Sequence, residues 1–192
     1  SRWGWYPKGG GEIKTMLRCC KPSGSLILDN PFKLKRVSGI SASSRLPEHI
    51  RVRQRRQLLL RFRKAGIEAD IGLMDVPALN PGSLVFLRAQ GGESVAGFSS
   101  LGARGKRAER VADEAANALF RFLDSKAALD QYLADQILIY LAITPGEHRF
   151  TTSEITQHLL TSTWVIEEFL PVHFEVEGGV GEAGLVIKRD TG

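Results

Sequence analysis

The sequence predicts a mixed α/β protein of the α+β type, in which a small βαβββα unit interrupts a second α/β layer. Two patterns support this fold class. Apolar residues alternate with polar ones in several short segments, as in strands, and recur every three or four residues in longer segments, as in helices. Prolines and glycines separate these segments. The hydrophobic content of 43% over 192 residues is sufficient for a packed core.

The first part of the chain is expected to form strands. Residues 12–18 alternate polar and apolar side chains after a turn over 7–11, and a second strand is expected at 25–28. Cys19 and Cys20 are adjacent, and a disulfide between neighbours on a strand would be strained. These cysteines therefore indicate a reducing compartment and no metal site.

Residues 37–125 are expected to form the interrupting unit. The pattern is a strand, a helix, three strands and a second helix, with Pro47 opening the first helix and Gly66 ending it. The corresponding ranges are 37–43, 47–64, 67–74, 84–89, 95–99 and 107–123.

The flanking residues, 1–36 and 126–192, are expected to form one α/β layer. A helix over 129–143 is apolar on almost every side in its second half, which predicts deep burial. The remaining elements are a strand at 148–152, a helix from the Thr156 region to Leu170, and strands at 172–177 and 185–188.

Positive charge is concentrated in one segment. The net charge is +5, yet residues 35–64 alone contribute +9 and the rest of the chain −4. Lysine and arginine neutralise phosphates, so Arg51, Arg55 and Arg56 are candidate RNA-binding residues. A solvated helix face explains the same pattern, and both interpretations stay open.

The sequence contains no apolar run of the roughly 20 residues that a membrane helix needs, and residues 1–7 do not resemble a signal peptide. We therefore expect a soluble, cytoplasmic protein with no membrane partner.

His158 is the strongest candidate for chemistry. It lies in the first turn of an expected helix, where unpaired N–H groups and the positive end of the helix dipole attract phosphate and disfavour imidazolium. A neutral imidazole at this place is able to attack an α-phosphate and hold a nucleotidyl group covalently. The alternative is a histidine at the start of an ordinary helix.

Three polar residues interrupt the apolar helix over 129–143: Tyr132, Asp135 and Gln136. A buried carboxylate or amide needs a hydrogen-bonding partner. A nucleotide ligand and a neighbouring backbone group both remain candidates for that partner.

Two other features suggest no site. The glycines at 9–11 precede an expected strand, whereas phosphate loops lie between a strand and a helix, so a turn is the better interpretation. The spacing of His49, His148 and His173 indicates no metal cluster.

Separated motifs in this order resemble the RNA 3′-terminal phosphate cyclase family. They are GWYPKGGG at 4–11, YLADQ at 132–136 and HLLT at 158–161, with further similarity at GKRAE, 105–109, and FLPV, 169–172. The resemblance implies a large domain of repeated βαβαββ-type units, formed here by 1–36 and 126–192, with a small inserted domain at 37–125.

The resemblance also implies an activity, the ATP-dependent conversion of an RNA 3′-phosphate to a 2′,3′-cyclic phosphate with Mg²⁺ or Mn²⁺. In this family a histidine, matched by His158, forms a covalent adenylate. Tyr132 and Asp135 would then contact the adenosine, and Gln136 would lie near the phosphates.

The similarity covers the C-terminal part of the family sequence. The expected partners are therefore RNA with a 3′-phosphate end and either the family's N-terminal region or a second chain, so that a dimer or another oligomer is expected. The alternative function is a non-catalytic, cyclase-like RNA-binding or ribosome-assembly protein, or an RNA module formed by the basic segment alone.

Overall fold

The computed structural model describes residues 2–18, 24–92 and 94–191, which form two compact units. Unit 1 combines Ser1–Arg18 with Lys33–Phe120, and unit 2 combines Cys19–Phe32 with Arg121–Gly192. The mixed α/β class is confirmed, because each unit contains a four-stranded sheet with helices. Within the described residues, no helix has the length and apolar character required to cross a membrane.

The sheet of unit 1 has the order β3-β2-β4-β5. Its strands are β2 (Arg36–Ser44), β3 (Ala69–Asp75), β4 (Gly82–Gly91) and β5 (Ser94–Leu101). β2 pairs parallel with β3 and antiparallel with β4, and β4 pairs antiparallel with β5. A parallel pair requires a crossover, and α1 (His49–Lys64) supplies it between β2 and β3.

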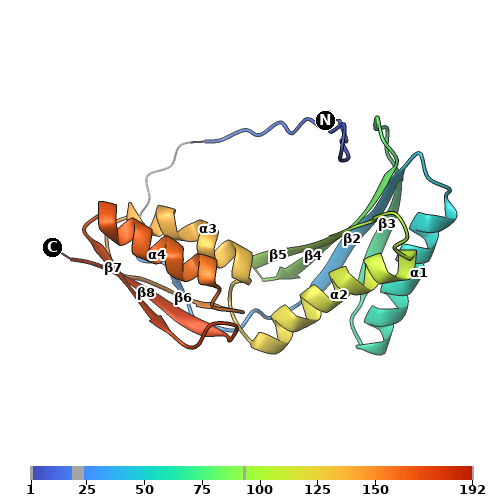
Figure 1. Cartoon of the computed structure of the whole chain (residues 1–192). Helices are drawn as coiled ribbons and strands as arrows, with labels where there is room; N and C mark the ends of the chain where they lie inside the picture. The colour runs from blue at the N-terminus through green and yellow to red at the C-terminus, as the bar shows by residue number, and fades with distance from the viewer. Residues whose placement is uncertain (1, 19–23, 93, 192) are drawn as a thin grey trace. The chain divides into compact units, whose positions relative to one another are not determined.

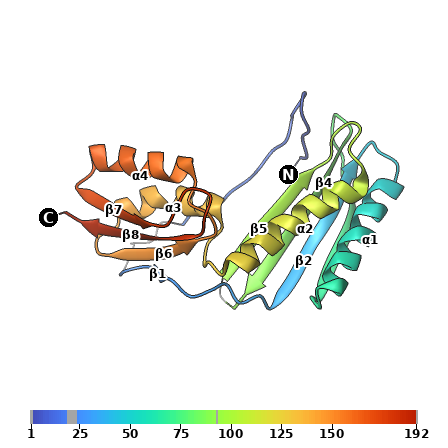
Figure 2. The ribbon, with the colours of Figure 1, turned by 60° about the horizontal axis from the view of Figure 1, so that its bottom comes forward.

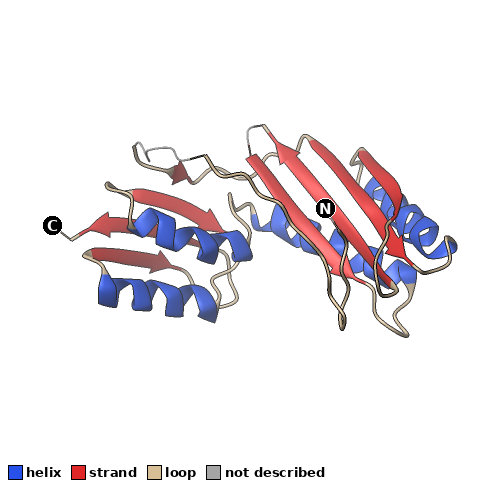
Figure 3. Cartoon of the chain, turned by 90° about the horizontal axis from the view of Figure 1, so that it is seen from above, coloured by secondary structure: helices blue, strands red, loops and turns tan. Residues whose placement is uncertain are grey.

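Both helices of unit 1 cover the same face of its sheet, as Figures 1 and 3 show for α1 and α2 (Ala108–Ser125). Side chains of β4 alternate between the two faces, so Val85 and Leu87 are buried while Phe86 and Arg88 are exposed. The helices add fully buried side chains to this core, including Leu58, Phe62 and Leu119.

Polar contacts join α1 to α2 above this core. Arg53 donates to Glu109 at 2.7 Å, and Arg61 donates to Asp113 at 2.7 Å. The hydrogen bond from Arg53 lowers the pKa of Glu109 to about 2. Part of the positive charge on α1 is therefore balanced within unit 1.

Unit 2 contains a sheet with the order β1-β6-β8-β7. Its strands are β1 (Ile27–Leu28), β6 (His148–Thr152), β7 (Val172–Glu177) and β8 (Gly184–Asp190). In Figure 2, α3 (Gln131–Ala142) and α4 (Gln157–Phe169) lie along these strands. Their buried side chains form one apolar core with the sheet, which includes Leu138, Leu159, Phe150 and Val186.

Most predicted elements are confirmed. The βαβββα order is present from β2 to α2, and the later helices and strands lie within a few residues of the expected ranges. Pro47 precedes α1, and Gly66 follows it with a φ of +69°. That backbone conformation is accessible to glycine at little cost, which explains why the helix stops there. The assignment of 1–36 and 126–192 to a large domain stays a prediction.

Two predictions are wrong. The strand expected over 12–18 is not formed: Glu12 makes only an isolated bridge with Arg2, residues 13–18 pair with no strand in the described part of the chain, and Ile13, Met16 and Leu17 are exposed. The second half of α3 is not deeply buried, because only one side of the helix contacts the core and Tyr140 and Ile143 face solvent. Cys19 and Cys20 lie outside the described residues.

Two glycines of unit 1 test the sheet packing. A Cβ atom at Gly39 would lie 2.4 Å from the Phe86 carbonyl oxygen, whereas at Gly72 the nearest atoms are 3.8 Å away. We expect Gly39→Ala to lower the free energy of unfolding by about 1–3 kcal/mol, because the backbone of β2 or of β4 at Phe86 must shift to make room for the added methyl group. Gly72→Ala, the matched control, should change it by less than about 1 kcal/mol. Urea unfolding of both variants measures the difference, and equal effects would contradict the described packing.

Candidate active site

The start of α3 is fixed by Asp130. One of its carboxylate oxygens accepts hydrogen bonds from the backbone N–H groups of Tyr132, at 2.9 Å, and Leu133, at 3.1 Å. Such a cap satisfies donors that the helix itself leaves free. It therefore sets the position of the first turn and of the polar residues that follow.

The start of α4 is fixed in the same way by Thr156, whose hydroxyl oxygen accepts from the Leu159 backbone N–H at 3.0 Å. Leu159 is fully buried and anchors this turn in the core of unit 2. His158 precedes it on the other side of the helix, with 76% of its side chain exposed. The predicted position of His158 in the first turn is confirmed.

Asp135 and His158 are brought together by the packing of α3 against α4. A carboxylate oxygen of Asp135 lies 3.0 Å from Nδ1 of His158, and the Asp135 side chain is only 15% exposed. The Ser162 hydroxyl lies 3.5 Å from the same nitrogen. An ionised carboxylate accepts hydrogen bonds but donates none, so Asp135 selects the neutral tautomer with the proton on Nδ1. Nε2 is then the nitrogen with a free electron pair.

Tyr132 shares a face of α3 with Asp135, three residues later, and with Gln136, four residues later, because such spacings place side chains on one helix face. Tyr132 is 68% exposed, Gln136 is exposed, and neither side chain hydrogen-bonds within the described part of the chain. The expected burial of polar groups in this helix applies only to Asp135, and His158 is its partner. The two free side chains are available to a ligand.

The two helices that carry this site also expose large apolar side chains. Besides Tyr132, the exposed ones on α3 and α4 are Leu133, Ile139, Tyr140, Trp164, Val165 and Phe169. Large apolar side chains exposed on neighbouring helices are typical of an interaction site.

The candidate RNA-binding arginines of α1 do not form one set. Arg51 is only 12% exposed, and its guanidinium donates to the Ser43 hydroxyl at 3.1 Å and lies 3.5 Å from Glu48. Arg55 and Arg56 are exposed and form no ion pair with any described residue. Arg51 therefore stabilises unit 1, while Arg55 and Arg56 are available to phosphates.

The remaining histidines have structural surroundings. His148 is buried, and its Nδ1 accepts from the Leu26 backbone N–H at 2.9 Å. Nδ1 of His173 lies 3.2 Å from Glu167. Across the residues that the structure describes, no group of three or more His, Cys, Asp or Glu side chains is arranged to hold a metal ion.

The glycine run near the N-terminus forms the predicted turn. The Gly9 N–H donates to the Trp5 carbonyl at 2.8 Å, and Gly9 and Gly10 have φ values of +62° and +80°. No helix follows this turn.

Sequence reasoning alone missed the contact between Asp135 and His158. The sequence points to each residue separately, to Asp135 by the polarity of one helix and to His158 by the start of the other. The available signal was the apolar pattern of both helices, which predicts that they pack together but leaves the register of the packing open.

The family model of RNA 3′-terminal phosphate cyclase matches residues 1–176. An RNA 3′-terminal phosphate cyclase of Pyrococcus furiosus is 38% identical over 96% of this chain and 54% of its own length. Relatives with the same name from Methanopyrus kandleri and Methylococcus capsulatus are 37% and 38% identical, and the matches cover 100% and 96% of this chain. The chain spans about half the length of the curated relatives that it matches.

The tautomer of His158 tests the site geometry. In the neutral ring we expect the proton on Nδ1, because Asp135 accepts it at 3.0 Å. Asp135→Ala removes the acceptor and should shift the proton toward Nε2, which ¹⁵N chemical shifts of the labelled ring measure. Gln136→Ala, a change one residue away that leaves the contact intact, should leave the tautomer unaltered. An unchanged tautomer in Asp135→Ala would contradict the assignment.

Proposed function

The chain belongs to the RNA 3′-terminal phosphate cyclase family, and we propose that it supplies the nucleotide-accepting part of such an enzyme, with His158 as the nucleophile. The observation that supports this most strongly is the contact of His158 Nδ1 with Asp135, which leaves Nε2 free in the first turn of α4. The overall reaction would convert an RNA 3′-phosphate to a 2′,3′-cyclic phosphate at the expense of ATP.

In the first step, the electron pair of His158 Nε2 attacks the α-phosphorus of ATP. An N–P bond forms, the P–O bond to pyrophosphate breaks, and pyrophosphate leaves with that electron pair. Asp135 stabilises the positive charge that develops on the ring, because its carboxylate accepts the Nδ1–H. The start of α4 favours the anionic phosphate next to it.

In the second step, an oxygen of the RNA 3′-phosphate attacks the phosphorus of AMP, and the electron pair of the N–P bond returns to Nε2. In the third step, the adjacent 2′-oxygen attacks the terminal phosphorus, AMP leaves and the hydroxyl proton is released. The neighbouring hydroxyl is already close to its target, so this closure has the advantage of an intramolecular reaction.

Tyr132, Asp135 and Gln136 are proposed to bind the nucleotide. The side chains of Tyr132 and Gln136 are exposed and free, which suits contacts with adenosine and phosphates, respectively. One carboxylate oxygen of Asp135 faces His158, and the other remains for the adenosine.

A requirement for Mg²⁺ or Mn²⁺ remains part of the proposal. No cluster of protein ligands for such an ion occurs within the described residues, so we assign no step to it. The family's N-terminal region, or a second chain, is proposed to pack against the apolar side chains exposed on α3 and α4. RNA processing in the cytoplasm is the proposed setting.

A non-catalytic role in RNA binding or ribosome assembly is the second candidate. It is favoured by the exposed, unpaired guanidinium groups of Arg55 and Arg56, which would bind RNA phosphates without any reaction at His158. The two candidates differ in whether AMP becomes attached to the chain.

Adenylation separates them. We expect the chain, incubated with α-labelled ATP and Mg²⁺ or Mn²⁺, to acquire acid-labile, base-stable label. His158→Ala should lower labelling by about 10³-fold or more, because the nucleophile is lost. His173→Ala, which removes another exposed histidine next to a carboxylate, should label normally. The proposal is contradicted by normal labelling of a folded His158→Ala chain, or by no label on the wild type either alone or with the N-terminal region of a relative.

The RNA surface of α1 has its own test. Reversing charge in the double variant Arg55→Glu, Arg56→Glu should weaken binding of single-stranded RNA. The slope of log affinity against log salt should fall by about 1.4, since two phosphate contacts are lost. The control is the double variant Arg88→Glu, Arg121→Glu, which makes the same change in charge at two exposed arginines outside α1 and should weaken RNA binding less. Equal losses in both double variants, measured by RNA titration at several salt concentrations, would contradict a specific surface on α1.

A further inference from the structure

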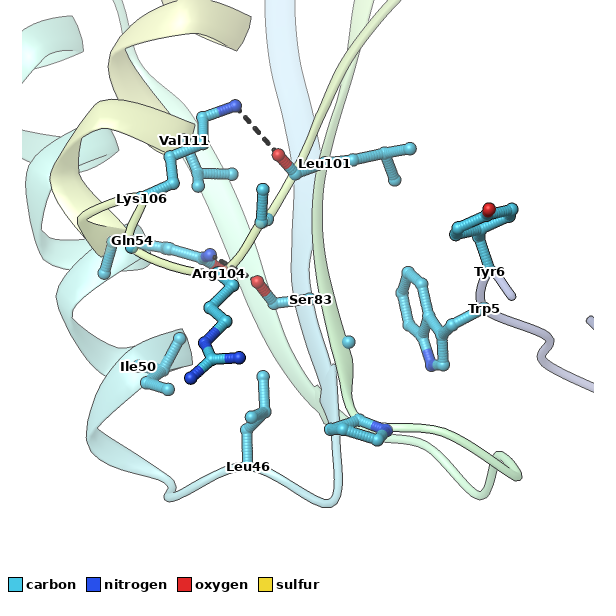
Figure 4. A pocket seen from close by; sticks show the side chains of 16 residues that line it. Trp5, Tyr6, Leu46, Ile50, Gln54, Ser83, Leu101, Arg104, Lys106 and Val111 are labelled. Atoms are coloured by element: carbon cyan, nitrogen blue, oxygen red, sulfur yellow. Dashed lines mark hydrogen bonds between the residues drawn. The ribbon is translucent and has the colours of Figure 1, made fainter. Parts of the chain in front are cut away.

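Unit 1 contains a pocket of about 700 Å³ that is separate from the His158 site. Figure 4 shows its walls: Leu46 in the loop before α1, Ile50 in the first turn of α1, Val111 of α2, and Trp5 with Tyr6 on the opposite side. Most of the lining is apolar, as in many sites for ligands with an aromatic ring.

The charge around the pocket is positive. Its lining includes Arg104 and Lys106 but no aspartate or glutamate. Lys106 is already engaged, since it pairs with Glu114 and donates to the Leu101 carbonyl at 2.8 Å. Arg104 forms no hydrogen bond or ion pair with any residue in the described ranges, and its guanidinium projects toward Leu46 and Ile50 in Figure 4. It is the lining cation that remains available to an anion.

Buried polar groups lie at the base of the pocket. Gln54 is 0% exposed; its amide nitrogen donates to the Ser83 hydroxyl at 3.1 Å, and its oxygen accepts from Ser41 at 2.6 Å. The polar side chain of Gln54 is therefore held in place at the base of the pocket by Ser41 and Ser83.

The aromatic wall is held in place by specific contacts. A Cβ atom at Gly82 would lie 2.3 Å from the Trp5 ring, so only glycine allows the indole to lie against β4. The Asn80 side chain donates to the Trp5 carbonyl at 3.2 Å. Trp5 Nε1 is buried without a partner in the described structure, and Tyr6 is 94% exposed. The exposed ring of Tyr6 therefore offers a flat apolar surface beside the indole of Trp5.

We propose that this pocket binds a nucleotide, a phosphate-bearing nucleoside that is either one unit of an RNA strand or free in solution. The base packs on Trp5 and Tyr6, because aromatic side chains stack with any base. The phosphate pairs with Arg104, whose planar guanidinium donates two hydrogen bonds in parallel.

The test uses the indole N–H signal of Trp5 in NMR spectra, assigned with Trp5→Phe among the three tryptophans. The whole chain contains His158→Ala, so that attachment of AMP at His158 does not interfere. We expect AMP to shift the Trp5 signal in a saturable manner, and adenosine to bind about tenfold more weakly because it lacks the phosphate.

Variants of the phosphate partner make the test specific. Arg104→Ala should weaken AMP about tenfold and remove the difference between AMP and adenosine. Arg104→Lys should restore part of the affinity, since it retains the charge but not the fork of donors. Arg88→Ala is the matched control, because Arg88 is an exposed arginine on the other face of β4, bonded to Gln90 at 3.2 Å. Tyr6→Ala should weaken both ligands about tenfold.

A second titration distinguishes the two sources of the nucleotide, an RNA strand and a free nucleotide. A single-stranded RNA tetranucleotide that binds more tightly than AMP identifies a strand as the ligand, and tighter binding of AMP identifies a free nucleotide. The proposal is overturned if neither ligand shifts the Trp5 signal, or if a folded Arg104→Ala chain binds AMP as tightly as the parent. Because His158 is absent throughout, failure here is distinguishable from failure of the proposed adenylation.

Discussion

The contact between Asp135 and His158 is the interaction on which the proposed chemistry depends. Histidine has two ring nitrogens, and a nucleophile needs one of them free of a proton and accessible to solvent. The carboxylate of Asp135, 3.0 Å from Nδ1, fixes the proton on that side. Nε2 then points away from α3 with its electron pair free. A histidine in the same helix turn without this partner would have no preferred tautomer imposed by the protein.

The scaffold of unit 2 makes the contact reproducible. Asp130 and Thr156 cap α3 and α4, which sets the residue at which each helix begins. The apolar core between the helices and the sheet then determines how one helix packs along the other. A shift of a single residue in either helix would turn its side chain by about 100° and separate the pair. The contact therefore depends on the helix caps and on the apolar core of unit 2.

Much of this arrangement could be predicted from the sequence. The βαβββα order, the start of α4 before His158 and the turn at Gly9 follow from local signals such as proline, glycine and the spacing of apolar residues.

The pairing of Asp135 with His158 could not be predicted, because it depends on the register between two helices. Exposure of Tyr140 and Ile143 was also missed, since an apolar side chain indicates a preference for burial but not what covers it. The sequence also does not predict the hydrogen bond from Arg51 to Ser43, because Ser43 lies on another element, β2. The pocket at Arg104 has a local signal in the sequence: two glycines and three basic residues at 102–107 come directly before a helix. The opposite wall is formed by Trp5, and the sequence does not indicate that Trp5 lies there.

The central claim is that Asp135 leaves Nε2 of His158 as the attacking atom, and the most direct measurement is to identify the atom that bears AMP. Chain labelled with ¹⁵N in histidine, incubated with ATP and Mg²⁺ or Mn²⁺ both alone and with the N-terminal region of a relative, would be examined for coupling between phosphorus and ring nitrogen. The account predicts that the phosphorus is bonded to Nε2 of His158. Attachment through Nδ1, attachment to another residue, or no attachment of AMP would contradict it.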